Sequence, residues 1–124
     1  MEFDKNLPVY WQIIEIVKLR IIRKEYLPGS MVPSVRTLAE ECCVTGNTLQ
    51  RAYLELVREG ILVPVRGIGF KVTEDKRKLT KLREHAIDER LEKLHLDCIK
   101  IGISDLELCS IFDQYMNQIG RAHV

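Results

Sequence analysis

Apolar side chains recur at helical spacing near the start of the chain. They are separated by one, three or four residues, so they share one face of a predicted helix. These positions are Tyr10, Ile13, Ile14, Val17 and Ile21. Pro8 suits the first turn, because its missing N–H gives up no hydrogen bond there. The helix is predicted to end within residues 26–30, because Pro28-Gly29 favours a turn.

Two shorter amphipathic helices follow, and each starts after a residue that caps helices. The hydroxyls of Ser34 and Thr45 suit the N-cap, and Gly60 suits the left-handed residue that ends the second helix. The apolar positions in them predict one buried side each. These are Val35, Leu38, Ala39 and Cys42 in the first helix and Leu49, Ala52, Tyr53, Leu56 and Val57 in the second. By subtraction, the outward positions are Arg36, Asn47, Gln50, Arg51 and Arg58.

A β-hairpin is predicted directly after these helices. Residues 61–65 and 70–72 are short β-prone runs, separated by Arg66-Gly67-Ile68-Gly69. Pro64 marks the first run as an edge strand. A helix-turn-helix followed by a hairpin is a winged helix-turn-helix, a shape that fits DNA. We therefore predict an α+β, mostly α fold with a winged helix-turn-helix DNA-binding domain at residues 1–74.

Residues 75–118 carry a different helical pattern. A short heptad seam runs up to Gly102, and Ser104 with Glu107 forms a capping box for a last helix. Two helices alone bury two apolar stripes poorly, so they either fold back on the DNA-binding domain or meet a second copy, and we expect a dimer. The dimerisation residues are Ile87, Leu91, Leu94, Cys98 and Ile101 in the seam and Leu108, Ile111, Phe112 and Tyr115 in the last helix.

The last six residues, 119–124, are expected to be a non-native tail. They read Ile119-Gly120-Arg121-Ala122-His123-Val124, which is what a common sequencing-adaptor read-through encodes. The tail, with His123, is therefore left out of functional reasoning.

Composition and charge narrow the class of protein. With 124 residues, 46% of them hydrophobic, the chain has room for one modest core and an appendage. No apolar run approaches the roughly 18 residues of a membrane span, and the start lacks the order of a signal peptide, so we expect a cytoplasmic protein without a membrane partner. The net charge is only +1. Its distribution matters more, because basic positions gather around the outward face at Arg36, Arg51, Arg66 and Lys71.

A second basic cluster follows the hairpin. It consists of Lys76, Arg77, Lys78, Lys81 and Arg83. It either touches flanking DNA phosphates or forms the solvated start of a helix.

Cysteine and histidine positions argue against a metal site, a cofactor or an enzyme. Cys42, Cys43, Cys98 and Cys109 have neither C-x-x-C spacing nor histidines at zinc-ligand spacing. We expect Cys42, Cys98 and Cys109 to be small buried apolar residues. The adjacent pair Cys42 and Cys43 leaves a redox switch as an alternative. His85, His95 and His123 belong to no nucleophile, base and acid set.

The motifs as a set resemble the GntR family of bacterial transcription regulators. The matching stretches begin with Pro8-Val9-Tyr10-Trp11-Gln12-Ile13 and continue through Leu27-Pro28-Gly29 and Pro33-Ser34-Val35-Arg36 to Val44-Thr45-Gly46-Asn47-Thr48-Leu49, Glu59-Gly60-Ile61-Leu62 and Arg66-Gly67-Ile68-Gly69. The short C-terminal region is similar to the YtrA-like subgroup, which implies a tail that mainly dimerises the protein. Two positions depart from the family pattern: Gly46 stands where many members have Arg, and Lys71 where an aromatic residue is common.

Chemistry and resemblance together predict the DNA contacts. Arg51 suits guanine, Asn47 or Gln50 suits adenine, and Arg36 and Thr48 suit phosphates. Arg66 and Gly67 at the wing tip suit a narrow minor groove. The full set of candidate DNA-binding residues is Ser34, Arg36, Thr45, Asn47, Thr48, Gln50, Arg51, Arg66, Gly67 and Gly69.

The predicted function is a homodimeric repressor of a pseudo-palindromic operator on double-stranded DNA. Repression follows from economy, because a small dimer on a promoter blocks polymerase without an activation surface. The resemblance also implies control of an ABC-type transporter operon, and it leaves open an unidentified small-molecule effector. The alternatives are a redox-sensing repressor through Cys42 and Cys43, and a winged helix used only for protein contacts.

Overall fold

The computed structural model describes residues 2–122, which form five helices and one two-stranded antiparallel sheet. They group into two compact units, Met1–Arg83 and Glu84–Val124. The first holds the winged helix-turn-helix and the second holds most of the C-terminal helices. The predicted fold class is confirmed.

The first helix, α1 (Val9–Ile22), buries the predicted face against the core of the first unit. Its end differs from the prediction, which had placed the stop within residues 26–30. The helix ends at Ile22, and Lys24 then takes a left-handed conformation at φ 64°. Tyr26 folds back so that its hydroxyl accepts a hydrogen bond from Arg20 Nη1 at 2.8 Å. The helix therefore ends several residues before Pro28, where the backbone N–H groups of Glu25 and Tyr26 turn back to the Arg20 carbonyl.

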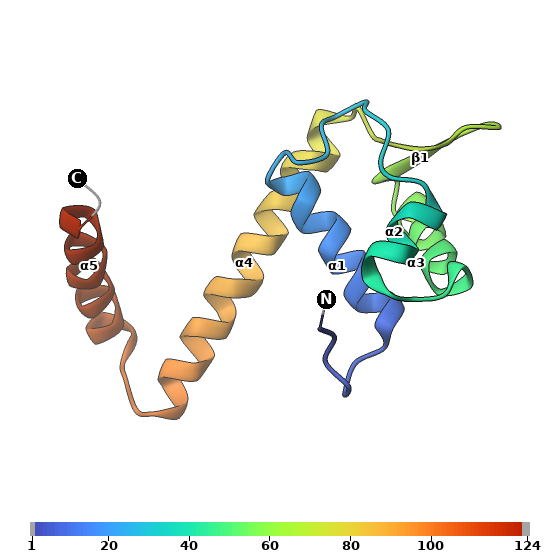
Figure 1. The fold of residues 1–124 in the computed structure, drawn as a ribbon. Helices are drawn as coiled ribbons and strands as arrows, with labels where there is room; N and C mark the ends of the chain where they lie inside the picture. Colours follow the sequence, from blue (N-terminus) through green and yellow to red (C-terminus); the bar gives the residue numbers. More distant parts are fainter. Residues whose placement is uncertain (1, 123–124) are drawn as a thin grey trace. The chain divides into compact units, whose positions relative to one another are not determined.

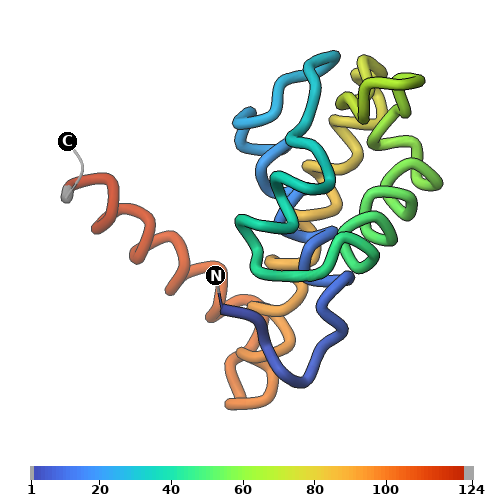
Figure 2. Tube along the Cα trace, turned by 45° about the vertical axis from the view of Figure 1, so that its right-hand side comes forward, coloured from blue at the N-terminus to red at the C-terminus, as the bar shows by residue number. Residues whose placement is uncertain are grey.

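Helices α2 (Val35–Cys42) and α3 (Gly46–Arg58) form the helix-turn-helix. They lie beside α1 in Figure 1, and Figure 2 shows the short turn that joins them. The turn is possible because Cys43, the residue after α2, adopts φ 56°. Predicted inward residues fill the core, and Leu38, Leu49, Ala52 and Tyr53 have no exposed surface.

The wing consists of β1 (Leu62–Val65) and β2 (Gly69–Val72), paired in register from Leu62 opposite Val72 to Val65 opposite Gly69. Figure 1 shows this hairpin projecting away from the helices of its unit. On its other side β2 forms an isolated bridge between Lys71 and Met31. The strand that contains Pro64 is therefore at the edge, as predicted.

Helix α4 (Lys76–Lys100) starts after the Asp75 carboxylate, which accepts hydrogen bonds from the backbone N–H groups of Arg77 and Lys78. Leu79 and Leu82 pack against the core of the winged domain. The first turns of α4 thus belong to the first unit, and the boundary between the units lies later than residue 74.

In the second unit α4 ends at Lys100, and Gly102 just beyond it takes a left-handed φ of +83°. The Ser104 hydroxyl then caps α5 (Asp105–Ala122) by accepting from Glu107 N at 3.2 Å. His95 Nε2 lies 2.7 Å from Asp105 Oδ1, which ties α4 to the first residue of α5. His123 and Val124, the last part of the predicted tail, lie outside the described residues.

The apolar stripes of the second unit are not covered. None of the residues of α4 is buried, and Ile87, Leu91 and Ile111 are each about half exposed. The expected burial of two cysteines is wrong within this chain, because Cys109 is exposed and Cys98 is only half-buried. Among residues 2–122, neither of them belongs to the buried core cluster, whereas Cys42 of α2 is part of that core, as predicted.

Candidate nucleic-acid interface

Two hydroxyl side chains fix where the helix-turn-helix begins each helix. Ser34 Oγ accepts from Thr37 N at 3.1 Å, and Thr45 Oγ1 accepts from Thr48 N at 3.3 Å. Thr45 Oγ1 also lies 2.9 Å from the Thr48 hydroxyl. Ser34 and Thr45 are therefore occupied as caps, and they present the positive N-terminal ends of α2 and α3, which favour anions.

The outward side of α3 carries the polar residues predicted for base contacts. Asn47 and Gln50 are exposed and Thr48 is half-buried. Asn47 and Arg51 are one helical turn apart and so share a side of the helix. Arg51 does not extend freely, however: its guanidinium carbon lies 3.8 Å from the centre of the Tyr10 ring on α1.

The other two predicted DNA-facing elements are also exposed. Arg36 on α2 carries a loose ion pair with Glu40, at 3.3 Å between Nε and Oε1. At the wing tip Arg66 and Gly67 are exposed, and Gly67 adopts a left-handed φ of +75° that a side chain would disfavour. Ile68 beside them is 73% exposed, and no role was predicted for this apolar residue at the wing tip. Gly69 is half-buried at the start of β2.

Ion pairs divide the cations of the first unit into those with a carboxylate partner and those without one. Five acidic side chains of the first unit are paired, with Lys18, Arg20, Arg23, Arg36 and Arg58 as their partners. Among residues 2–122, no carboxylate lies within the 4.0 Å ion-pair limit of Arg66, Lys71, or the α4 cations 76–78, 81 and 83. These cations remain available for phosphates.

Tyr53 connects the three elements of the interface. Its hydroxyl donates to the backbone carbonyl of Pro33, just before the Ser34 cap, at 2.7 Å. Its ring meets Phe70 of β2 edge-on, with 5.2 Å between ring centres. Burial raises the pKa of the Tyr53 hydroxyl, so it stays a neutral donor. The sequence placed Tyr53 in the buried stripe of α3 but gave no signal of this linking role.

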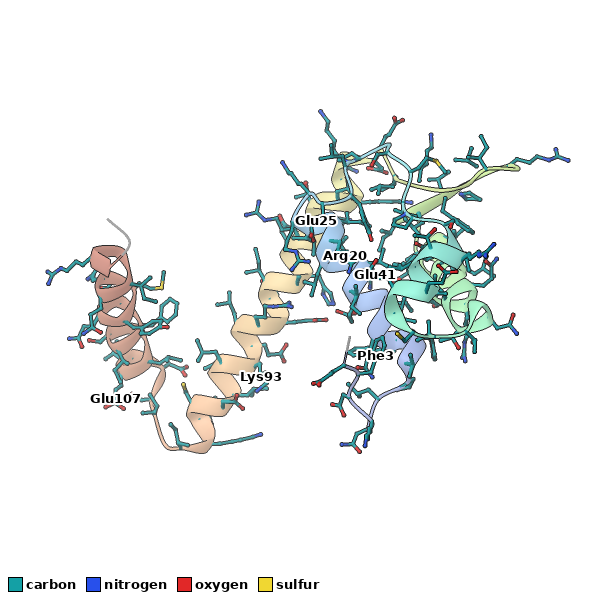
Figure 3. All side chains as sticks on the ribbon, viewed as in Figure 1. Phe3, Arg20, Glu25, Glu41, Lys93 and Glu107 are labelled. Carbon is teal, nitrogen blue, oxygen red and sulfur yellow. The ribbon has the colours of Figure 1, made fainter. Side chains whose placement is uncertain are left out.

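A second polar cluster holds α2 against α1. Arg20 Nη2 donates to Glu41 Oε1 at 2.6 Å, and Figure 3 shows the two side chains meeting between the helices. The hydrogen bond from Arg20 holds the pKa of the Glu41 carboxyl below its ordinary value. This cluster was not predicted, because residues 20 and 41 lie far apart in the sequence.

The start of the chain is held by Gln12. Its side-chain amide donates to the carbonyls of Asp4 and Leu7, at 2.7 and 3.0 Å, and its carbonyl oxygen accepts from Asp4 N. Phe3 packs against the core. Gln12 belongs to the motif at residues 8–13, and its side chain holds the backbone of Asp4 and Leu7 beside the start of α1.

The comparison with protein families agrees with this geometry. The model described as "Bacterial regulatory proteins, gntR family" matches residues 9–72, which contain every candidate DNA-binding residue. The chain belongs to the GntR family. It is therefore a DNA-binding transcriptional regulator by family and not an enzyme.

Relatives of this GntR chain extend over most of its length. It is 35% identical over 107 residues to the uncharacterized HTH-type transcriptional regulator YhcF of Bacillus subtilis, which covers 86% of this chain and 88% of the relative. It is 37% identical over 99 residues to the HTH-type transcriptional repressor YtrA of the same organism, covering 79% and 76%. The YtrA-like resemblance is confirmed.

Solved GntR-type structures show the same fold. A GntR family transcriptional regulator from Listeria monocytogenes has a TM-score of 0.84 and 33% identity, covering 90% of this chain and 98% of that chain. The DNA-binding domain of AraR, solved in complex with operator ORR3, has a TM-score of 0.53 and 32% identity, covering 59% and 86%. The first shows the likeness across both units, and the second involves a domain that is bound to DNA.

Two further properties concern the described part of the GntR chain. Within residues 2–122, none of the helices has the length and apolar content needed to cross a membrane. Nor does this part of the chain bring together three or more His, Cys, Asp or Glu side chains in a group suited to a metal ion.

Proposed function

We propose that this GntR regulator is a homodimeric repressor that binds a pseudo-palindromic operator. The observation that carries the proposal is the exposed polar surface formed by the capped N-termini of α2 and α3 and the tip of the wing. Two copies would set two α3 helices in successive major grooves, about 34–36 Å apart. Asn47 and Gln50 read bases, and Arg36, Thr48 and Arg66 hold the backbone or the minor groove.

The second unit supports the dimeric part of the proposal. Its apolar stripes are exposed in the single chain, and exposed apolar stripes at heptad spacing favour pairing with another helix. A second copy of the same segment carries the same stripes. The repressive output is supported by the name of the relative YtrA, which is a repressor.

The proposal extends to the genes that the protein regulates, and it includes an unidentified small-molecule effector. Control of an ABC-type transporter operon rests on the resemblance to short GntR regulators. A repressor of this kind acts where the chromosome is, in the cytoplasm. Transcript levels of neighbouring transporter genes, with and without the regulator gene, test the link: unchanged transcripts would contradict it.

The redox alternative receives no support from the geometry around Cys42. Oxidation requires a thiolate, and burial raises the pKa of the Cys42 thiol. Cys42→Ser and Cys43→Ser variants that lose a peroxide response of DNA binding would favour this alternative. A parent protein without such a response would remove it.

The decisive experiment is a fluorescence-anisotropy titration of the purified protein against the promoter DNA upstream of its own gene, with scrambled DNA as the control. We expect saturable binding of two chains per site that is tighter than binding to scrambled DNA and weakens steeply with salt. Equal weak binding to both DNAs would contradict recognition of that promoter. A footprint across the flanking genes would then decide between an operator elsewhere and a winged helix used for protein contacts.

A further inference from the structure

Arg51 has surroundings that its exposed position in the sequence does not suggest. Its guanidinium carbon lies 3.8 Å from the centre of the Tyr10 ring, within van der Waals contact of the ring face. Such a stack of Arg on Tyr is attractive, because the ring face is electron-rich. Tyr10 belongs to the first turn of α1, so the contact turns Arg51 towards the side of α3 that faces α1.

The donors of Arg51 remain available in this position. The acid one turn further along α3, Glu55, accepts from Arg58 Nε at 3.0 Å. Among residues 2–122, no carboxylate lies within ion-pair distance of Arg51. Stacking uses the face of the guanidinium and leaves its N–H groups at the edge, where they match two oxygens of one phosphate.

Helix dimensions indicate what a side chain at this position meets in a DNA complex. A helix with its side chains is about 10–12 Å across and the major groove is about 12 Å wide, so the helix fills the groove. Residues at the centre of its outward side reach base edges, whereas residues on its flanks face the sugar-phosphate walls. Asn47 and Gln50 are exposed on the outward side, whereas Arg51 lies against the Tyr10 ring on the flank.

We propose that Tyr10 holds the Arg51 guanidinium on the flank of α3, where it binds a backbone phosphate and not a base edge. This inference rests on DNA binding through α3, and it replaces the guanine contact predicted for Arg51 from its residue type. Arg51 then contributes affinity and register without sequence preference, and Tyr10 is its positioning residue.

Most of the acidic residues beside Arg51 already have cationic partners. The hollow beside Arg51, about 280 Å³ in volume, is also lined by Glu15, Glu55 and Glu59. Glu55 is bonded to Arg58, and Glu59 lies 3.3 Å from Lys18 Nζ. Two of the three carboxylates are therefore already neutralised by partners other than Arg51.

The test compares Arg51→Ala with Arg23→Ala, using anisotropy titrations on promoter and scrambled DNA at several salt concentrations. Arg23 is an ion-paired arginine at the far end of α1, about 20 Å from Tyr10 along the helix axis. Arg51→Ala should weaken binding to both DNAs by the same factor, roughly tenfold, and lower the salt slope by about 0.9 per chain. Arg23→Ala should change neither.

Two outcomes would overturn the proposal. A loss of affinity confined to the promoter, with the salt slope unchanged, would indicate a base contact. Arg51→Ala that binds like Arg23→Ala would show that Arg51 makes no contact with DNA.

Tyr10 variants test the positioning part. Tyr10→Phe keeps the ring and should bind DNA like the parent. Tyr10→Leu should reduce DNA affinity by part of the factor lost in Arg51→Ala. Combining Tyr10→Leu with Arg51→Ala should cause no further loss of affinity beyond that of Arg51→Ala alone. An additional loss in the double variant would show that Tyr10 acts independently of Arg51.

Arg51→Lys provides a second test if Tyr10→Leu does not fold. It keeps the charge, so the salt slope of DNA binding should remain while affinity for both DNAs falls several-fold. Parent-like binding by Arg51→Lys would show that stacking is irrelevant.

The outcome is separable from that of the proposed operator. A parent protein that binds promoter and scrambled DNA equally would contradict operator recognition. The slope comparison on scrambled DNA would still decide whether Arg51 contacts a phosphate.

Discussion

Arginines of equal charge have different roles here because their neighbours differ. Arg20 is bonded to Glu41 and Tyr26, Arg51 lies on the Tyr10 ring, and Arg66 stands at the tip of the wing. A guanidinium that already has a carboxylate partner contributes to the fold, whereas one without such a partner can hold a phosphate. The same reasoning gives one prediction for Arg66 and one for Glu41, the carboxylate partner of Arg20.

Replacing Arg66 should affect DNA binding and leave the fold intact. Arg66→Ala removes an exposed cation at the wing tip, so we expect affinity for promoter DNA to fall roughly tenfold with only a modest loss of sequence preference. Anisotropy titration measures both quantities, and the ion-paired Arg23→Ala is again the control. A variant that binds like the parent would contradict the assignment of the wing as a DNA contact.

Replacing Glu41 should change how stability depends on pH. Its pKa is lowered by Arg20, so the pair contributes stability above the ordinary carboxyl value of 4.5 and loses that contribution as the pH falls through the lower folded value. Glu41→Gln should lower the free energy of unfolding at neutral pH by about 1 kcal/mol or less, because the carboxylate is partly exposed.

Urea denaturation at neutral pH and at about pH 3 measures this effect, and the difference from the parent should shrink in acid. Glu15→Gln is a suitable control, since among residues 2–122 Glu15 has no cation within ion-pair distance. A difference that stays constant with pH would show that the Glu41 charge is not responsible.

At the scale of an element, α3 owes its ends to local chemistry and its orientation to packing. Thr45 caps its start, and beyond its end Gly60 takes φ +78° while Ile61 N donates to Leu56 O at 2.9 Å. The Lys78 side chain of α4 lies directly over Gly60, where a Cβ would meet it. The end of α3 is therefore also where the Lys78 side chain at the start of α4 packs.

Gly60→Ala should destabilise the winged domain. A left-handed conformation costs a residue with a Cβ about 1–2 kcal/mol, and Lys78 must also move. Gly46→Ala is the matched control, because it stands at the first position of α3 with open space around it and should not lower stability. Urea denaturation of both variants checks this. Equal loss in both would show that the strain at Gly60 is not the cause.

At the scale of the whole molecule, the two units are stabilised differently. The first unit has a core of buried residues from α1, α2, α3 and the wing. In the second unit, the described residues of α4 include no buried side chain, and the stripe on α5 is exposed. A partner that covers these stripes would supply the apolar burial that the single chain lacks.

Disrupting the seam should therefore change the oligomeric state. Leu91→Glu places a charge in the seam and should yield monomers in sedimentation velocity, with much weaker binding to a two-half-site operator. Leu96→Glu is the control: Leu96 is 48% exposed and Leu91 52%, but the two lie about 140° apart round the helix. Dimers that survive Leu91→Glu, or are lost equally with Leu96→Glu, would contradict the predicted seam.

What the sequence by itself determined was the local and periodic part of this protein. Capping by Ser34, Thr45 and Ser104, the buried faces of α1 to α3, the hairpin turn and the helical C-terminal segment follow from spacing and residue type, because each depends on neighbours within a few positions. The family follows from the motifs that these positions form.

Only the tertiary structure decided how distant residues meet. The early end of α1, the Arg20 and Glu41 pair, the link from Tyr53 to Pro33 and Phe70, and the place of Arg51 on Tyr10 all join positions that periodicity treats separately. An exposed arginine has many orientations of similar energy, so its residue type does not select one. A neighbouring ring or carboxylate from another element does, and the fold brings that neighbour into reach.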